Sequence, residues 1–323
     1  MIIDIHCDLL SHPHFSDQDL GVRCSPDQLL SGGVHTQVCA MFTHHHLDSF
    51  SLNEQNQLFF SLPKQDQRIR LLTFDSEELY REGFLSIIRS IENASGLGDD
   101  ATNLHDIFRK LVSLFSQGPI AYIGIVWNGR NRFGGGVLDP YKLTTDGCRL
   151  LEVMDQLAIP IDLSHCCDQL TEDILDYTIN KLPAMRVMAS HSNFRQITYI
   201  PRNLLDVHAK EISSRGGIIG LNIVNYFVGD SLDSIKYHIA HAEKLGILNS
   251  LVLGTDFFYE KSEDKFFENC TTARDHPYLH QIIRNCLLKP EQAENILGKS
   301  AQVFLNTVIR EQKERHAERL YLD

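Results

Sequence analysis

Six residues of the kinds that bind metal ions follow apolar, β-rich segments of this 323-residue chain. His6 and Asp8 come two residues apart at the end of the first segment, and strand side chains alternate faces, so both point the same way. Later segments end in Glu92, His165, His191 and Asp256. Each residue alone has a plainer explanation, such as an ordinary hydrogen bond or a helix cap. Together they predict a metal centre, because histidines with a bridging carboxylate are what two neighbouring divalent ions require.

The elements that must position these residues are eight apolar runs separated by segments with helical spacing. The runs cover residues 2–6, 35–42, 85–91, 120–126, 158–164, 185–190, 217–223 and 249–255. Several are almost continuously apolar, as strands buried on both faces are. Strands that alternate with helices form a parallel sheet, and eight of them close a barrel whose chemistry lies at the carboxyl ends of the strands. We expect an α/β fold, a (β/α)8 TIM barrel of the metal-dependent hydrolase type.

The secondary structure of some segments between the runs is easier to predict than that of others. Residues 145–157 predict a helix with one apolar face, formed by Leu150, Met154 and Leu157. Residues 44–80 are harder to interpret, and Leu58–Leu62 could be a loop or a short helix. The triplet His44-His45-His46 is expected in an exposed loop that could overhang the metal centre.

The C-terminal part of the chain predicts helices outside the barrel. Residues 289–298 indicate a short helix, with proline near its first turn and glycine after its end. A further helix is expected to pack against the barrel through Val303, Phe304 and Val308. We therefore expect residues 1–323 to form a single barrel domain with a helical extension from about 288.

Composition excludes several classes of function. The net charge of -12 argues against binding to nucleic acid, because no basic stripe is present. No apolar run approaches the roughly 20 residues that span a bilayer, and the first residues lack the basic region of a cleavable signal. The eight cysteines have no C-x-x-C spacing, which favours free thiols in a reducing compartment. We expect a cytoplasmic protein that binds neither nucleic acid nor membrane.

Specific motifs give the chain a resemblance to the membrane dipeptidase (renal dipeptidase) family of zinc hydrolases, which has bacterial cytoplasmic members. The resemblance runs from His6 to about residue 310. It rests, in order, on His6-Cys7-Asp8, Gly32-Gly33-Val34 with Gln37, Ile91-Glu92, Asp162-Leu163-Ser164-His165, Ala189-Ser190-His191-Ser192, Arg202-Asn203-Leu204, Gly216-Gly217 and Gly254-Thr255-Asp256-Phe257. Each motif alone is weak, whereas their order is specific.

The resemblance implies a dinuclear zinc hydrolase that cleaves the amide bond of dipeptides. His6 and Asp8 would bind one zinc ion, His165 and His191 the second, and Glu92 would bridge both. A hydroxide held between the two ions would attack the amide carbonyl.

The resemblance also implies roles around the metals and a homodimeric assembly. Asp256 would carry the proton to the leaving amine, and Arg202 would hold the C-terminal carboxylate of the dipeptide with its planar fork. Without the resemblance, Asp256 could cap the next helix and Arg202 could form a surface ion pair.

The chain departs from the family after the fourth predicted strand. Members usually carry a histidine there, in a Thr-His-x-x-Asn setting, that binds the tetrahedral oxyanion, whereas here Trp127 or Asn128 takes its place. Losing one oxyanion donor typically costs about 10²–10³ in rate. Asn128 or Arg130 could substitute as a donor, and Trp127 offers an indole N–H. The usual Glu-Gly-Gly is also altered, to Glu92-Asn93-Ala94.

Two alternatives to a dipeptidase follow. A phosphoesterase or deoxyribonuclease-like barrel would end its first strand in His-x-His, so the His-x-Asp found here disfavours it. A barrel that binds metal but acts on another amide or small ester, or has lost turnover, is consistent with Trp127.

Overall fold

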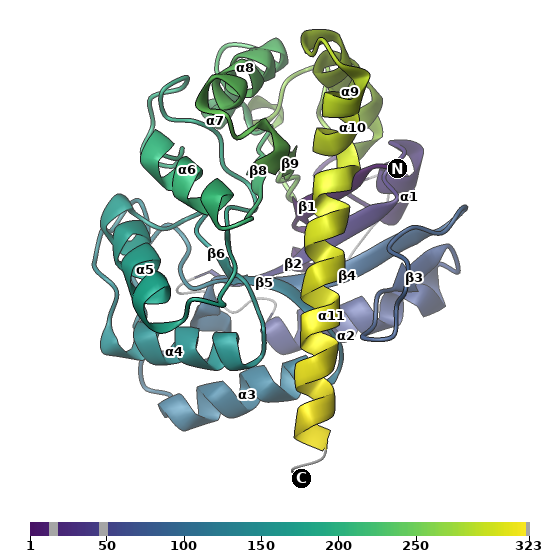
Figure 1. The fold of residues 1–323 in the computed structure, drawn as a ribbon. Coiled ribbons are helices and arrows are strands. Elements are labelled where there is room, and N and C mark those ends of the chain that lie inside the picture. The colour runs from purple at the N-terminus through teal and green to yellow at the C-terminus, as the bar shows by residue number, and fades with distance from the viewer. Residues whose placement is uncertain (13–18, 45–50, 321–323) are drawn as a thin grey trace.

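The computed structural model describes residues 1–12, 19–44 and 51–320, which form a nearly closed barrel of eight parallel strands (Figure 1). The strands are β1 (Ile3–Cys7), β2 (Thr36–Phe42), β4 (Leu85–Glu92), β5 (Ile120–Gly124), β6 (Ile161–Asp162), β7 (Val187–Met188), β8 (Ile219–Leu221) and β9 (Leu251–Leu253). They pair in the order β7-β6-β5-β4-β2-β1-β9-β8, and a single parallel bridge between Ala189 and Ile219 brings the two edges together. Each of the eight predicted runs overlaps one of these strands, so the TIM-barrel prediction is confirmed.

A short extra strand lies outside the barrel. Strand β3 (Ile69–Leu71) pairs with the first half of β4, and β5 pairs with the second half. It is preceded by α2 (Leu52–Gln65), which starts with a reciprocal capping box between Ser51 and Glu54. The segment Leu58–Leu62 is therefore part of a long helix. His45 and His46 lie outside the described residues.

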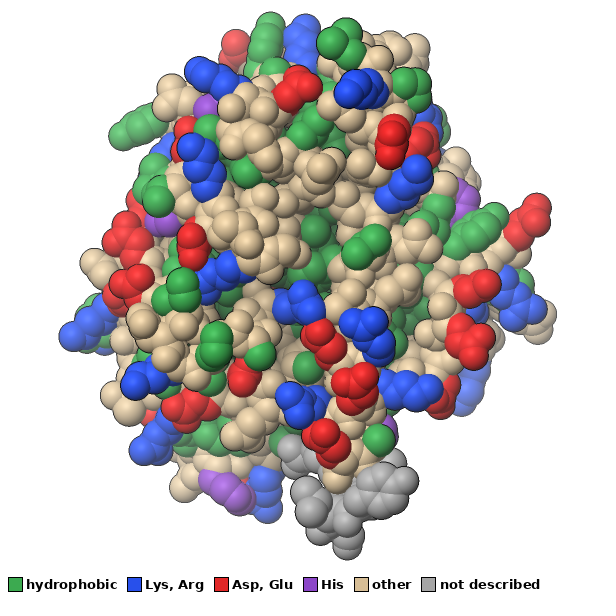
Figure 2. Space-filling view, in the orientation of Figure 1, with side chains coloured by type: hydrophobic (Ala, Val, Ile, Leu, Met, Phe, Trp, Pro, Cys, Tyr) green, Lys and Arg blue, Asp and Glu red, His purple; other side chains and the backbone are tan. Residues whose placement is uncertain are grey.

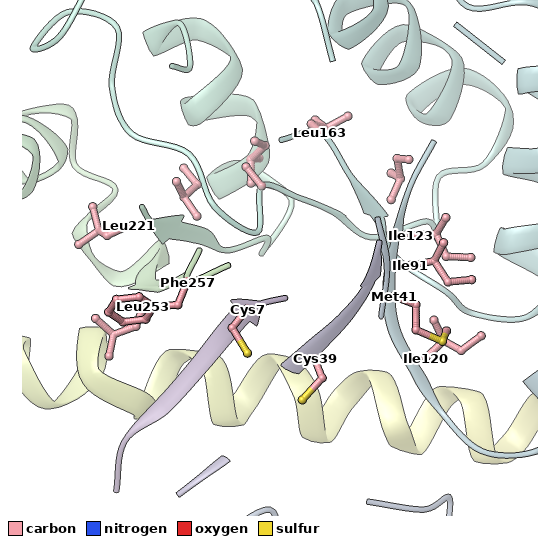
Figure 3. Close-up of a cluster of buried hydrophobic side chains, with 14 of the residues drawn as sticks. Cys7, Cys39, Met41, Ile91, Ile120, Ile123, Leu163, Leu221, Leu253 and Phe257 are labelled. Atoms are coloured by element: carbon pink, nitrogen blue, oxygen red, sulfur yellow. The ribbon is translucent and has the colours of Figure 1, made fainter. Parts of the chain in front are cut away.

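An apolar layer separates the strands from the surrounding helices. These are α1 (Pro26–Ser31), α2, α3 (Leu104–Ser116), α4 (Thr145–Gln156), α5 (Asp168–Lys181), α6 (Asp206–Ser214), α7 (Asn225–Val228), α8 (Ile235–Leu245), α9 (His276–Cys286) and α10 (Pro290–Glu294). Figure 3 shows part of the layer, where Cys7 and Cys39 from β1 and β2 lie among aliphatic side chains. The predicted face of α4 is buried, which confirms that helix. No helix in the described part of the chain is long and apolar enough to cross a membrane.

The long helix α11 (Ser300–Leu320) closes the amino-terminal end of the barrel. Phe304 and Val308 are buried against the inner residues Ile3 and Val252, whereas Val303 is 68% exposed, contrary to prediction. Gln312 adds hydrogen bonds to both backbone groups of Ile120, at the start of β5. Figure 2 shows acidic and basic side chains interspersed over the face that α11 crosses.

The predicted helix end at Gly298 is wrong. A π-helical turn over Asn295–Lys299 joins α10 to α11, so the helix continues. A Cβ at Gly298 would lie 2.5 Å from the carbonyl oxygen of Met1, so the glycine allows close contact with the first residues and does not terminate the helix.

Strand β1 contains a bulge that decides which side chains enter the barrel. Three residue steps from Asp4 to Cys7 match only two steps along β2. Ile3 and Ile5 therefore belong to the inner cluster, but Cys7 belongs to the outer layer. Regular alternation would put Asp4 on the face of His6, yet Asp4 instead binds Thr255 and faces α9. Bulges commonly redirect a side chain next to a functional site.

Candidate metal centre

The six predicted residues meet at the carboxyl end of the barrel strands. Ligand-type atoms lie within 4.8 Å of one another in three overlapping groups, namely His6/Asp8/Glu92, Glu92/His165/His191 and His6/His191/Asp256. Glu92, His6 and His191 each belong to two groups. The shared members indicate one continuous centre with room for more than one cation.

One side of the centre is rich in imidazole. His165 Nε2 lies 2.8 Å from Glu92 Oε1 and 2.9 Å from His191 Nε2. His191 Nε2 lies 3.7 Å from the same carboxylate oxygen. Two imidazole nitrogens facing each other this closely need a cation or a shared proton between them.

The other side is rich in carboxylate. His6 Nε2 lies 3.3 Å from Glu92 Oε2, 3.5 Å from Asp256 Oδ1 and 3.9 Å from Asp8 Oδ1. Among the described residues, His6 Nε2, Asp8 Oδ1 and Glu92 Oε2 have no hydrogen-bond partner, although all three atoms are buried. Buried polar atoms are rarely left this way, and this donor set, with its excess negative charge, fits a divalent cation.

Hydroxyl groups behind two of the histidines decide which ring nitrogen carries hydrogen. Tyr122 donates its one hydroxyl hydrogen to the Ile5 carbonyl at 2.8 Å, so its oxygen accepts from His6 Nδ1 at 2.7 Å. Ser190 donates to Asp162 at 2.5 Å and accepts from His191 Nδ1 at 2.6 Å. With hydrogen held on Nδ1, both histidines turn Nε2 toward the centre, where a metal ion would take the place of any proton on it.

The third histidine is held by an amide. His165 Nδ1 lies 2.9 Å from Asn128 Oδ1, and its side chain is 10% exposed where those of His6 and His191 are fully buried. With Nδ1 donating to that oxygen, Nε2 again faces the centre.

The electrostatics of the metal-free centre favour positive charge. Burial opposes ionisation of His6, yet Glu92, Asp256 and Asp8 raise its pKa to about 10. Burial would raise the pKa of Glu92, but the charges and hydrogen bonds of His6 and His165 hold it well below its usual range. Burial lowers the pKa of His165 to about 4. The metal-free site thus binds a proton strongly, and a metal ion could replace this proton as the positive charge among the carboxylates.

Asp256 is held in an unusual conformation at the edge of the centre. Its φ of 63° lies in the left-handed region, and its Oδ2 accepts a hydrogen bond from Asn222 at 2.7 Å. Burial is the main cause that raises its pKa to about 7. Asn93, where the family usually has glycine, has a φ of 74°, a conformation that asparagine tolerates.

Arg202 is buried beside the centre. Its guanidinium donates to Ser192 Oγ at 2.9 Å and to the carbonyl oxygen of His191 at 3.0 Å, while Nε has no partner among the described residues. Burial chiefly lowers its pKa, although Asp256 and Glu92 oppose that effect. Arg202 is therefore not in a surface ion pair.

The loop after β5 forms one wall of the site. The Trp127 ring is half-buried, with centroid distances of 5.1 Å to Phe42, 5.0 Å to His44 and 6.1 Å to His165. Arg130 is exposed and lies over Tyr141, with its guanidinium carbon 3.4 Å from the ring centroid.

Four supporting residues were not identified from the sequence. Ser190 and Asp162 stand within the quoted motifs, next to the predicted ligands, and Asn222 stands near the end of a predicted strand, which is a weak signal. Tyr122 lies mid-strand in a predicted run, where only its polar tip distinguishes it from core.

Comparisons with known proteins agree with this geometry. Residues 1–315 match the family described as membrane dipeptidase (Peptidase family M19). A Klebsiella pneumoniae protein encoded in the pqqA 5' region is 29% identical over 206 residues, covering 59% of this chain and 71% of that protein. A Schizosaccharomyces pombe dipeptidase, C965.12, is 28% identical over 211 residues, which span 60% of this chain but only 49% of the relative.

Solved structures share the fold. A metallopeptidase of family M19, dipeptidase AC, has a TM-score of 0.79 at 20% identity, covering 96% of this chain and 98% of its own. A Rhodobacter sphaeroides metallopeptidase, solved with a phosphinate mimic of L-Ala-D-Ala, has a TM-score of 0.75 at 19% identity, with 94% and 98% covered. The chain thus belongs to the membrane dipeptidase family (Peptidase family M19) and is a metallodipeptidase-like hydrolase.

Proposed function

We propose that this protein is a dinuclear zinc dipeptidase. The observation that carries the proposal is the buried cluster of three imidazole nitrogens and three carboxylates at the carboxyl end of the barrel. Several of these groups have no hydrogen-bond partner in the described part of the chain. His6 and Asp8 would hold one zinc ion, and His165 and His191 the other. Glu92 would bridge them, since Oε2 faces His6 while Oε1 faces His165.

The bound zinc ions and the side chains would supply different parts of the reaction. Bound zinc supplies a water of lowered pKa and polarises a carbonyl oxygen. Asp256 supplies the proton transfer at Oδ1, because Asn222 occupies Oδ2 and leaves Oδ1 facing the centre. Burial raises the pKa of this carboxyl to about 7 in the metal-free protein, and the positive charge of bound zinc would lower it, so that Asp256 would be ionised and ready to accept a proton.

Arg202 would select the length of the substrate. Its positive charge lies close enough to lower the pKa of both His165 and His191, and its Nε has no partner among the described residues. A guanidinium in this place would bind the C-terminal carboxylate of a dipeptide. Trp127, beside His165, would contact the substrate from the opposite loop.

A second candidate function is a metal-binding barrel that acts on another amide or small ester, or that has lost turnover. The observation that favours it is Trp127, which stands where the family usually has an oxyanion-binding histidine. Zinc binding is common to both candidates, so only kinetics separates them.

The direct test is an assay of zinc-reconstituted protein against L-L, L-D and glycine-containing dipeptides, with metal content measured on the same sample. The Rhodobacter sphaeroides neighbour binds a mimic of L-Ala-D-Ala, so D residues belong in the second position of the panel. We expect hydrolysis with two zinc ions per chain. If two zinc ions are bound and no dipeptide is hydrolysed, the dipeptidase proposal is wrong, and the metal-binding barrel with another substrate or no turnover remains.

The carboxylate clamp has its own test. Arg202→Ala should raise KM for dipeptides far more than for the corresponding dipeptide amides, which lack the carboxylate. An unchanged KM for free dipeptides would show that Arg202 has another role. The homodimer, the cytoplasmic location and the single domain over residues 1–323 stay predictions.

A further inference from the structure

The side-chain amide of Asn128, in the loop after β5, contacts the predicted metal ligand His165. Its Oδ1 lies 2.9 Å from His165 Nδ1, on the side of the ring away from the centre. His165 Nε2 faces Glu92 and His191, so a zinc ion bound there in the proposed function would leave the ring hydrogen on Nδ1. An imidazole N–H needs an acceptor, and therefore the amide must present its oxygen to the ring and not its NH2 group.

This bond leaves the Asn128 NH2 group without a partner among the residues that the structure describes. No hydrogen bond from Nδ2 to another described residue is found, and the side chain is half-buried. The amide cannot rotate by half a turn, because that would place two donors against each other at His165. Its N–H groups are thus held in one orientation relative to the His165 ring.

The loop that carries Asn128 is firmly attached. The backbone carbonyl of Asn128 accepts from Leu138 N at 2.8 Å, and Gly136 forms an antiparallel bridge with Cys166, the neighbour of His165. A Cβ at Gly136 would lie 1.8 Å from the Trp127 carbonyl oxygen, so the loop packs too closely for any side chain there. The amide and the imidazole are therefore fixed relative to each other.

Other donors near the centre are engaged elsewhere. Arg130 lies over Tyr141, and two nitrogens of Arg202 donate to Ser192 and to the backbone of His191. Arg202 Nε has no partner among the described residues but belongs to the group assigned to the substrate carboxylate, which leaves the Asn128 amide as an oriented donor for a second substrate group.

We propose that Asn128 has two roles in the reaction, a proposal that rests on the proposed function. Its Oδ1 orients His165 for metal binding, and its Nδ2 donates a hydrogen bond to the substrate carbonyl oxygen as negative charge develops there. A donor oriented before the reaction stabilises the transition state more than the substrate, so its loss lowers kcat more than it raises KM.

Two variants separate the roles. Asn128→Asp keeps an oxygen for His165 and removes both N–H groups, so zinc affinity should stay within about threefold while kcat falls about 10²–10³-fold. Asn128→Leu removes both functions, so zinc affinity should also fall about 10–100-fold. Zinc affinity is measured by competition with a chromophoric chelator, and kcat and KM on zinc-saturated protein. Asn180→Asp, on the exposed surface of α5, makes the same charge change away from the centre and is the control.

Each part can fail separately. Wild-type kcat in Asn128→Asp, or a change confined to KM, would overturn the donor role, and a hundredfold loss in Trp127→Phe instead would assign the donor to the indole N–H. Wild-type zinc affinity in Asn128→Leu would overturn the orienting role. If the wild type hydrolyses no dipeptide, the proposed function fails, but the zinc-affinity measurement still decides whether Asn128 orients His165.

Discussion

The two ends of the barrel are built on opposite physical principles. At the amino-terminal end, α11 packs apolar side chains such as Phe304 and Val308 against the inner residues of the strands. At the carboxyl end, buried carboxylates and imidazoles lie close together, and several of their atoms lack hydrogen-bond partners within residues 1–12, 19–44 and 51–320. The carboxyl end also holds Asn93 and Asp256 at positive φ.

The difference shows where stability and function are located. Close apolar packing stabilises the fold, whereas buried, unpaired polar atoms and backbone strain cost free energy and persist where they serve binding or catalysis. Substitutions at the two ends should therefore change different properties.

The largest effect is expected at Glu92, which faces His6 with one oxygen and His165 with the other. Glu92→Gln should lower the zinc content and reduce kcat by roughly 10³-fold or more, since several kcal/mol of metal-derived stabilisation depends on it. Metal analysis and dipeptide kinetics measure this, with the exposed Glu77→Gln as control. If the variant retained two zinc ions and a normal kcat, Glu92 would not be a metal ligand.

The opposite effect is expected at the amino-terminal end. Phe304→Ala should lower the free energy of unfolding by about 3–5 kcal/mol through the cavity it leaves, with zinc affinity and kcat unchanged in the folded protein. Denaturant unfolding checks this. Val303→Ala, on the same helix but 68% exposed, should change it by less than about 0.5 kcal/mol. Loss of zinc from a folded Phe304 variant would mean that the two ends are coupled.

A smaller effect should follow from weakening the groups behind the ligands. Ser190→Ala removes the link between His191 and Asp162 and should lower zinc affinity about 10–100-fold. Tyr122→Phe does the same behind His6 and should have a similar effect. Chelator competition measures both, with the exposed Ser116→Ala as control. Unchanged affinity in both variants would show that packing alone orients the rings.

The last effect concerns the pH dependence of stability. In metal-free protein, burial opposes the charge on His6 but its carboxylate neighbours raise its pKa from 6.5 to about 10. The resulting stability is fully present below pH 6.5 and is lost as pH rises through 10. The Tm difference between wild type and His6→Asn, measured in chelator, should therefore shrink from pH 7 to 10. A difference that grows over this range would contradict the charged state of His6.

Local patterns predicted the barrel strands and the residues at their ends, because apolar runs and their boundaries are properties of neighbouring residues. They did not predict the bulge in β1 or the strand β3, which depend on pairing with distant segments. The prediction that a helix ends at Gly298 was wrong for a related reason. Glycine often ends a helix, but here it allows contact with Met1, which no local pattern contains.

The partners of the metal-binding histidines were also beyond local prediction. Tyr122 could equally have been core, and only its position opposite His6 gives its hydroxyl a use. Asn128 was expected as a donor to substrate, but its bond to His165 depends on how the loop after β5 folds back onto β6.

The bulge in β1 has a consequence for how this strand can change during evolution. Substitutions between Asp4 and Cys7 alter one side chain at a time, whereas deleting one residue there would restore regular pairing with β2. With regular alternation Ile3 and one following residue would face the barrel interior while Asp4 and Cys7 face outward, so the shortened strand could direct only one of Ile5 and His6 inward, where the bulge now allows both. A loss of three nucleotides would thus remove either a metal ligand or an inner packing residue, and insertions and deletions here should be rarer than substitutions.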